Sequence, residues 1–242
     1  MTPISQYSTK ADYERLLLQG PPGSGKTTLA CSFPAPYFID IDVNLAGPLR
    51  YRTKRQLSLP VGYDRLDVDD DGKPIKGVIQ KFNRLDKLLL AAQANTEIQT
   101  IVLDSATGLS SLMLDKTALE NPTVKDGRQL FGFFLKAGLN LIGTLTAMQK
   151  NMVLTAHEVV DVDAMTGAKQ YRVMWPGQLH TYMSSFFTNA WRTEVVSDGY
   201  PPKFTYKVRT MQDASYYGLK NNYELPYLID QDKAIAVLQA AK

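Results

Sequence analysis

The amino-acid sequence predicts an α/β fold, with a mostly parallel central sheet flanked by helices and a C-terminal part rich in β-hairpins. Short apolar runs that end in polar residues alternate with longer segments of helical periodicity, and such alternation is typical of βαβ units. A glycine-rich loop joins the first apolar run to the first helical segment. After Glu158 the pattern changes to paired short segments separated by turn residues, which predicts hairpins.

The glycine-rich loop follows the apolar run Leu16–Leu18 and precedes a helix that is expected to begin near Lys26. It matches G-x-x-x-x-G-K-[S/T] in the strand–loop–helix context that this motif requires. Its residues, called the phosphate loop below, are Gly20, Pro21, Pro22, Gly23, Ser24, Gly25, Lys26, Thr27 and Thr28. Glycines let successive backbone N–H groups face one anion, and the helix start adds a positive dipole end. We therefore expect Lys26 to reach the β- and γ-phosphates of a nucleotide and Thr27 to contact Mg²⁺.

Length and composition favour one domain covering residues 1–242. The chain has 44% hydrophobic and 21% charged residues, which is ample apolar content for a large core. Its net charge of +3 is compatible with nucleic acid without requiring it. Residues 1–12 are polar and are expected to be a flexible N-terminus. No stretch approaches the roughly 18 apolar residues of a membrane span, and residues 1–10 lack an apolar signal core, so we expect a cytoplasmic protein without a membrane partner.

Two apolar runs, 37–42 and 98–105, are expected to be buried strands that end in carboxylates, where open α/β sheets place their chemistry. Asp104 is expected to hold Mg²⁺ through its water shell, with a helix N-cap as the alternative. A helix is predicted over 81–95, whereas residues 49–81 lack periodicity. That stretch contains a basic cluster, interpreted as a solvated face rather than a phosphate-backbone contact: Arg50, Arg52, Lys54 and Arg55.

The middle of the chain predicts two helices and a strand. One helix is expected after Asp104 and a longer one over 128–149, joined by a loop at 121–128. The run 152–156 predicts a buried strand that ends at His157. This histidine is placed to contact the γ-phosphate or a bound water, with a purely structural role as the alternative. Beyond it we expect strand pairs at 159–162 with 171–174 and at 190–196 with 204–210, and helices at 178–188 and 230–240.

Taken together, these motifs resemble the RecA core, and most closely the phage Sak-type single-strand annealing ATPases. The likeness spans residues 14–225. Besides the phosphate loop it rests on shorter segments: Phe38–Asp42, Ile101–Ser105, Gly127–Gly132, Val153–Glu158 and, more weakly, Tyr206–Thr210 with Lys220–Asn221. The resemblance implies a RecA-like P-loop core that binds ATP and Mg²⁺.

The resemblance also implies roles for individual residues. Asp42 stands where RecA-like proteins usually carry a glutamate that activates the attacking water, and Glu158 is the reserve candidate. His157 stands where they carry a polar sensor of the γ-phosphate. Residues 158–175 are then expected to be a mobile DNA-binding loop, and 121–128 a second DNA-facing loop. The expected DNA contacts are Lys125, Arg128, Lys169, Tyr171 and Arg172, and the candidates for a cation acting on a neighbouring subunit are Arg209 and Lys220.

The function expected from this resemblance is a DNA-stimulated ATPase that binds single-stranded DNA and promotes annealing or pairing in phage recombination. It implies a homo-oligomer, ring or filament, with ATP between subunits, a location in the host cytoplasm and a single-strand-binding protein as a further candidate partner. Two alternatives stay open. One is a P-loop kinase for a nucleotide or small molecule. The other is a nucleotide-gated regulatory protein with little hydrolysis, favoured by Asp42 because its side chain is one methylene shorter than glutamate.

Overall fold

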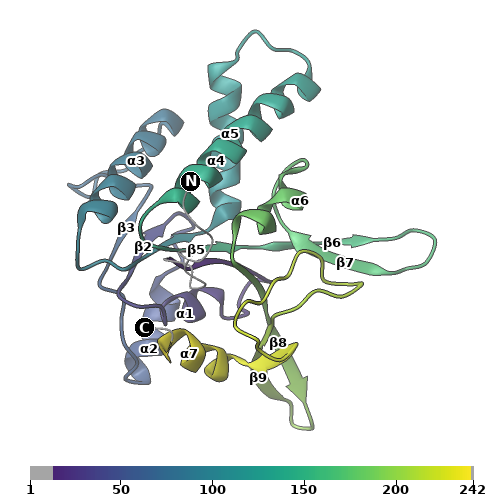
Figure 1. Ribbon diagram of the computed structural model, residues 1–242. Coiled ribbons are helices and arrows are strands. Elements are labelled where there is room, and N and C mark those ends of the chain that lie inside the picture. Colours follow the sequence, from purple (N-terminus) through teal and green to yellow (C-terminus); the bar gives the residue numbers. More distant parts are fainter. Residues whose placement is uncertain (1–12, 241–242) are drawn as a thin grey trace, which may run out of the picture.

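An eight-stranded sheet forms the centre of the computed structural model, which describes residues 13–240 (Figure 1). The predicted flexible segment 1–12 lies outside the described residues. The strands of this sheet are β1 (Arg15–Gln19), β2 (Pro36–Asp40), β3 (Gly62–Arg65), β4 (Thr100–Asp104), β5 (Asn151–Ala156), β8 (Asn189–Asp198), β9 (Lys203–Arg209) and β10 (Leu228–Asp230). Their spatial order is β10-β9-β8-β1-β5-β4-β2-β3.

Parallel pairing dominates this sheet. The neighbours from β8 through β1, β5, β4 and β2 to β3 all pair in parallel, whereas β9 and β10 are added antiparallel. Strands β1, β2 and β4 are buried throughout, as expected for a parallel sheet covered on both faces. The predicted fold class is therefore confirmed. Because parallel strands end at one edge, the residues that follow β1, β2, β4 and β5 meet there.

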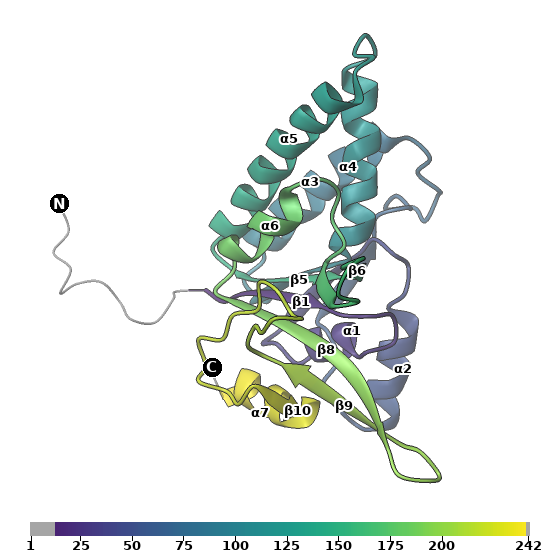
Figure 2. The same ribbon diagram turned by 90° about the vertical axis from the view of Figure 1, so that its right-hand side faces the viewer.

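Helices cover both faces of the sheet (Figure 2). They are α1 (Lys26–Ala30), α2 (Ala46–Lys54), α3 (Val78–Ala94), α4 (Ala106–Glu120), α5 (Gly127–Ala147), α6 (Leu179–Met183) with a 3-10 turn at Ser184–Phe186, and α7 (Gln231–Ala240). Alternate strand side chains point to opposite faces and so form two cores. Leu17 and Leu103 pack in the core shared with α3 to α6, whereas Leu16 and Val102 pack in the core shared with α1 and α7.

Two antiparallel units project beyond the sheet in Figure 1. One is the helical pair α4 and α5, in which the Asp126 carboxylate caps α5 by accepting a hydrogen bond from the Arg128 N–H. The other is the hairpin of β6 (Glu158–Val162) and β7 (Lys169–Val173), which occupies the predicted loop 158–175. Among the residues that the structure describes, α5 is the one helix long and apolar enough to cross a membrane, a test that apolar core helices also meet.

The structure corrects the interpretation of residues 49–81, which contain most of α2, strand β3 and the start of α3. Helix α2 lacks a marked apolar face and is anchored instead by Arg52. This side chain is buried and donates hydrogen bonds to Thr28, Ser32 and Ser58. The interpretation as a solvated face was therefore wrong for Arg52. The predicted helix 178–188 is also shorter than expected, because α6 ends at Met183.

Candidate nucleotide-binding site

The phosphate loop connects β1 to α1 at the edge where the parallel strands end. Gly23 and Gly25 have φ angles of 75° and 93°, a region that favours glycine. The Lys26 ammonium lies over the loop and donates to the carbonyl oxygens of Gly20 and Pro21, at 2.9 Å each. Burial lowers the pKa of Lys26, and the nearby Asp104 carboxylate opposes that shift. The geometry is that of an anion cradle with a cation at its mouth.

Thr27 and Asp104 come together as predicted. The Thr27 hydroxyl donates to Asp104 Oδ2 at 2.8 Å, and the Thr155 hydroxyl donates to Oδ1. Asp104 is buried, and this burial raises its pKa, while the two hydroxyl donors act in the opposite direction. A hydroxyl and a carboxylate beside a phosphate cradle are the oxygen ligands that Mg²⁺ prefers. These two residues therefore fit the metal-holding role assigned to them.

Asp42 and His157 meet across the same edge. The Ser105 hydroxyl donates to Asp42 Oδ2 at 2.6 Å, and His157 Nε2 lies 3.7 Å from the same oxygen. Asp40, at the end of β2, plays a different part, since its carboxylate accepts the backbone N–H groups of Asn44 and Leu45 and so shapes the turn into α2. Of the two carboxylates that follow or end β2, Asp42 lines the cleft and Asp40 does not.

One cleft of about 1140 Å³, called the nucleotide cleft below, is lined by Lys26, Thr27, Asp42, Asp104, Ser105 and His157. Its other walls come from α2, β9 and the start of α7. Tyr51, with the Arg55 guanidinium 4.7 Å from its ring centroid, lies on one side, and Phe204 and Tyr206 lie on another. Sequence reasoning missed these wall residues, because α2 was not predicted and β9 was treated only as part of a hairpin.

Glu158, the reserve candidate for the base, is engaged elsewhere. Its carboxylate accepts hydrogen bonds from Nε and Nη2 of Arg192, at 2.7 and 2.8 Å, and both side chains are buried. Arg192 also contacts Glu194, and its guanidinium lies against the rings of both Tyr171 and Tyr216. Arg192 was missed in the sequence, although two charges at alternate positions of an apolar strand are a recognisable signal for a buried ion pair.

The two candidates for a cation acting on a neighbouring subunit have partners within their own chain. Arg209 pairs with Glu194 at 2.8 Å and lies over the rings of Tyr216 and Tyr227. The Lys220 ammonium donates to two backbone carbonyls, at 3.0 and 2.9 Å. Their action on a neighbour stays a prediction.

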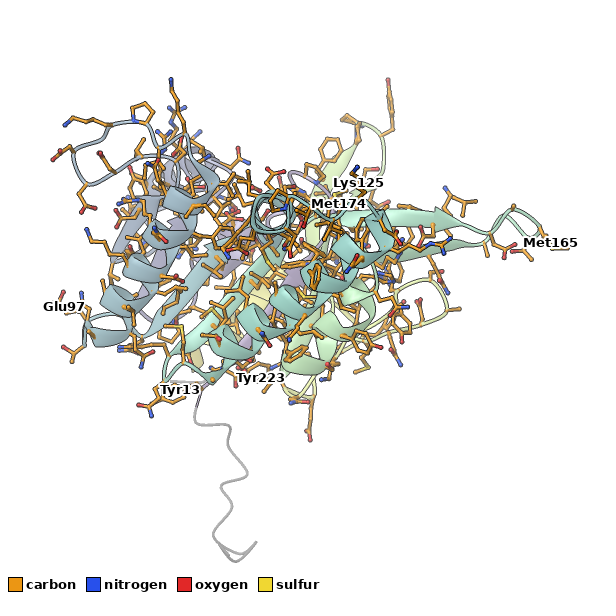
Figure 3. All side chains as sticks on the ribbon, turned by 90° about the horizontal axis from the view of Figure 1, so that it is seen from above. Tyr13, Glu97, Lys125, Met165, Met174 and Tyr223 are labelled. Carbon is orange, nitrogen blue, oxygen red and sulfur yellow. The ribbon has the colours of Figure 1, made fainter. Side chains whose placement is uncertain are left out.

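The predicted DNA contacts fall into two groups. Lys125 lies in the turn between α4 and α5, Arg128 lies in the first turn of α5, and both side chains are exposed. Lys169 is exposed on β7, whereas Arg172 pairs with Asp161 across the hairpin. Tyr171 stacks on Tyr216 with ring centroids 4.9 Å apart. Figure 3 shows Met165 at the far tip of this hairpin and Met174 near its base.

The fold and the phosphate loop define the class of protein, a P-loop nucleoside triphosphatase domain. The chain belongs to the AAA_24 family of AAA domains, whose family model matches residues 12–183. Family membership and the loop indicate nucleotide binding and ATPase-type chemistry. No curated protein shows a significant match to the chain.

Two solved structures are similar in fold. One is the KaiC-like protein PH0186 from the hyperthermophilic archaeon Pyrococcus horikoshii OT3, with 14% identity over 80% of this chain and 77% of that chain, at a TM-score of 0.43. The other is the flagellar accessory protein FlaH from Methanocaldococcus jannaschii, with 14% identity over 81% of this chain and 78% of that chain, at a TM-score of 0.39. Likenesses this distant carry no argument about function.

Proposed function

We propose that the chain is an ATPase that hydrolyses Mg²⁺-bound ATP and couples this cycle to single-stranded DNA, which it anneals or pairs. The observation that carries the proposal is the continuity of β5 with the β6–β7 hairpin. His157, which lies against Asp42 in the nucleotide cleft, is followed directly by the first residue of β6. A γ-phosphate that contacts His157 would therefore act on the residue directly before the projecting hairpin.

The cleft residues divide the hydrolytic work between them. Lys26 and the loop N–H groups would hold the phosphates, and Thr27 with Asp104 would hold Mg²⁺, which would neutralise charge on the phosphate oxygens. Ser105 occupies Oδ2 of Asp42, so we assign Oδ1 to orient and deprotonate the attacking water. The water oxygen bonds to the γ-phosphorus while the bond to the β–γ bridging oxygen breaks. ADP and phosphate are released.

Two contacts support coupling of His157 to both strands of the hairpin. The His157 carbonyl accepts a hydrogen bond from the Met174 N–H at 2.8 Å, just beyond β7. On the β6 side, Glu158 is held by Arg192, whose guanidinium packs on Tyr171 of β7. A shift of His157 towards a γ-phosphate therefore pulls on both ends of the hairpin.

The DNA partner is proposed from exposed cations on the two projecting units, Lys125 and Arg128 on one and Lys169 on the other. Such cations bind a phosphate backbone without reading its sequence, and binding of this kind weakens with salt. Assembly as a ring or filament, with ATP between subunits, also belongs to the proposal. It is tested by the ATP dependence of the oligomeric state.

The decisive experiment measures ATP hydrolysis with and without single-stranded DNA over a salt series, with Lys26→Ala as the blank. We expect single-stranded DNA to stimulate hydrolysis, and we expect this stimulation to weaken as the salt concentration rises. Lys169→Ala should reduce the slope of log affinity against log salt by about 0.7 if it removes one phosphate contact. Lys76→Ala is the matched control, because this lysine is exposed just before α3, and Figure 1 shows α3 on the opposite side of the molecule from the hairpin.

The DNA proposal would be overturned if the rate of ATP hydrolysis were the same with and without single-stranded DNA at every salt concentration. Phosphate transfer that depends on an added acceptor would then favour a kinase. Tight ATP binding with negligible turnover would favour a nucleotide-gated regulatory protein, as the short Asp42 side chain suggests.

A further inference from the structure

The phosphate loop is held by two residues outside the stretch that matches the AAA family model. That match ends at residue 183, before β8 and α7 begin. Thr193 of β8 and Gln231 of α7 both contact the loop, and both side chains are buried. Neither contact could be foreseen from the motif, because both partners are far away in the sequence, at separations of 169 and 206 residues.

Thr193 supports the first half of the loop. Its hydroxyl lies 2.6 Å from the Ser24 hydroxyl, and Ser24 in turn donates to the Pro21 carbonyl at 2.7 Å. Since the single proton of Ser24 is used on Pro21, Thr193 is the donor to Ser24. The Thr193 carbonyl also comes so close to Gly20 that a Cβ there would lie 2.4 Å from it. The first half of the loop therefore rests directly on β8.

Gln231 supports the second half. Its side-chain amide donates to the Gly25 carbonyl at 3.0 Å, and a Cβ on Gly25 would lie 2.6 Å from Gln231 Oε1. Helix α7 is fixed beneath it, because Ala234 and Leu238 are buried in the same core as Leu29 of α1. Gln231 is thus a rigid support for the loop.

We infer that Thr193 and Gln231 are positioning residues for nucleotide binding, which keep the loop's peptide groups turned towards the phosphates. Neither residue is assigned a contact with nucleotide. A loop with three glycines is free to adopt many conformations, and ordering it only on binding would cost affinity. Because Thr193 holds Ser24 and Gln231 holds the Gly25 carbonyl, the loop is already ordered before nucleotide binds. The inference concerns affinity for ATP and holds whether or not DNA is the partner.

The test compares Gln231→Leu, Gln231→Glu and Thr193→Val with the wild type, in the absence of DNA. Lys233→Ala is the control, since Lys233 is exposed on the same helix. Binding of ATP with Mg²⁺ is measured by titration calorimetry, turnover by phosphate release and folding by the thermal unfolding midpoint. Loss of one hydrogen bond predicts that Kd rises about fivefold for Gln231→Leu and for Thr193→Val, with kcat at saturating ATP unchanged.

Gln231→Glu separates positioning from simple packing. A carboxylate cannot donate to the Gly25 carbonyl and adds a negative charge near the phosphates, so its Kd should exceed that of Gln231→Leu. Thr193→Ser keeps the hydroxyl and should restore most of the affinity lost in Thr193→Val. The inference would be overturned if Gln231→Leu and Thr193→Val fold and bind ATP with the wild-type Kd. It would also be overturned if the control Lys233→Ala lost as much affinity for ATP as they do. If Thr193→Val fails to fold, the two Gln231 variants decide.

Discussion

Replacing Gly108 by alanine should displace the Asp42 carboxylate and slow hydrolysis without weakening nucleotide binding. A Cβ at position 108 would lie 2.3 Å from Asp42 Oδ1 and 3.0 Å from Ile41 Cγ2. Ordinary van der Waals contact begins near 3.4 Å, so the carboxylate must move by roughly 1 Å, a displacement that costs about 100-fold in rate when it affects a reacting group. The fold should survive, because alanine is favoured over glycine in a helix by about 1 kcal/mol.

The assay pairs steady-state phosphate release with ATP binding. We expect kcat to fall about 100-fold for Gly108→Ala, while Kd for ATP stays within about twofold. Gly143→Ala is the matched control, since Gly143 is also helical and a Cβ there meets nothing within 4 Å. If Gly108→Ala hydrolyses ATP at the wild-type rate, Asp42 is not the base and the assignment of its Oδ1 is wrong.

Three further variants test other parts of the structure. Arg52→Met should lower the free energy of unfolding by about 3 kcal/mol in urea titrations, because buried hydrogen bonds of a charged group are lost. Asp104→Asn should abolish Mg²⁺-dependent hydrolysis yet raise the thermal unfolding midpoint at pH 7. Because burial raises the pKa of Asp104, ionisation of this carboxyl removes stability as pH rises through its folded-state pKa. The difference in thermal midpoint between the variant and the wild type should therefore vanish below pH 3.8, the pKa of the unfolded state. Arg192→Met should cost about 3 to 5 kcal/mol by stranding buried Glu158, and adding Glu158→Gln should recover part of that loss in the same denaturation assay.

Strand periodicity and the loop motif were sufficient to predict the parallel core and the meeting of the phosphate loop, Asp42, Asp104 and His157. The reason is geometric, because all four lie at or just beyond the ends of parallel strands that share one edge. These signals are local in the sequence. Periodicity did not place the end of α6 correctly, because the helix stops at Met183 and the chain continues as a 3-10 turn over Ser184–Phe186.

Features that depend on distant partners could not be predicted. Helix α2 is held by one buried arginine rather than by an apolar face, so its sequence looks like an irregular basic stretch. Glu158 follows His157 directly, yet it is drawn to Arg192, 34 residues later in the chain. The contact of Gln231 with Gly25 joins two residues that are 206 positions apart in the sequence. In each case the decisive partner is fixed by the folded sheet.

Strand β8 places adjacent side chains on opposite faces, with Thr193 against the phosphate loop and Arg192 against Glu158 beside the hairpin. Inserting or deleting one residue ahead of this pair would exchange the two faces, so the hydroxyl and the guanidinium would each meet the wrong partner. Changes of chain length should be tolerated at the turn 199–202 and not within 190–194. In related sequences, the spacing between the loop-facing threonine and the preceding arginine should therefore stay constant even where the turn varies in length.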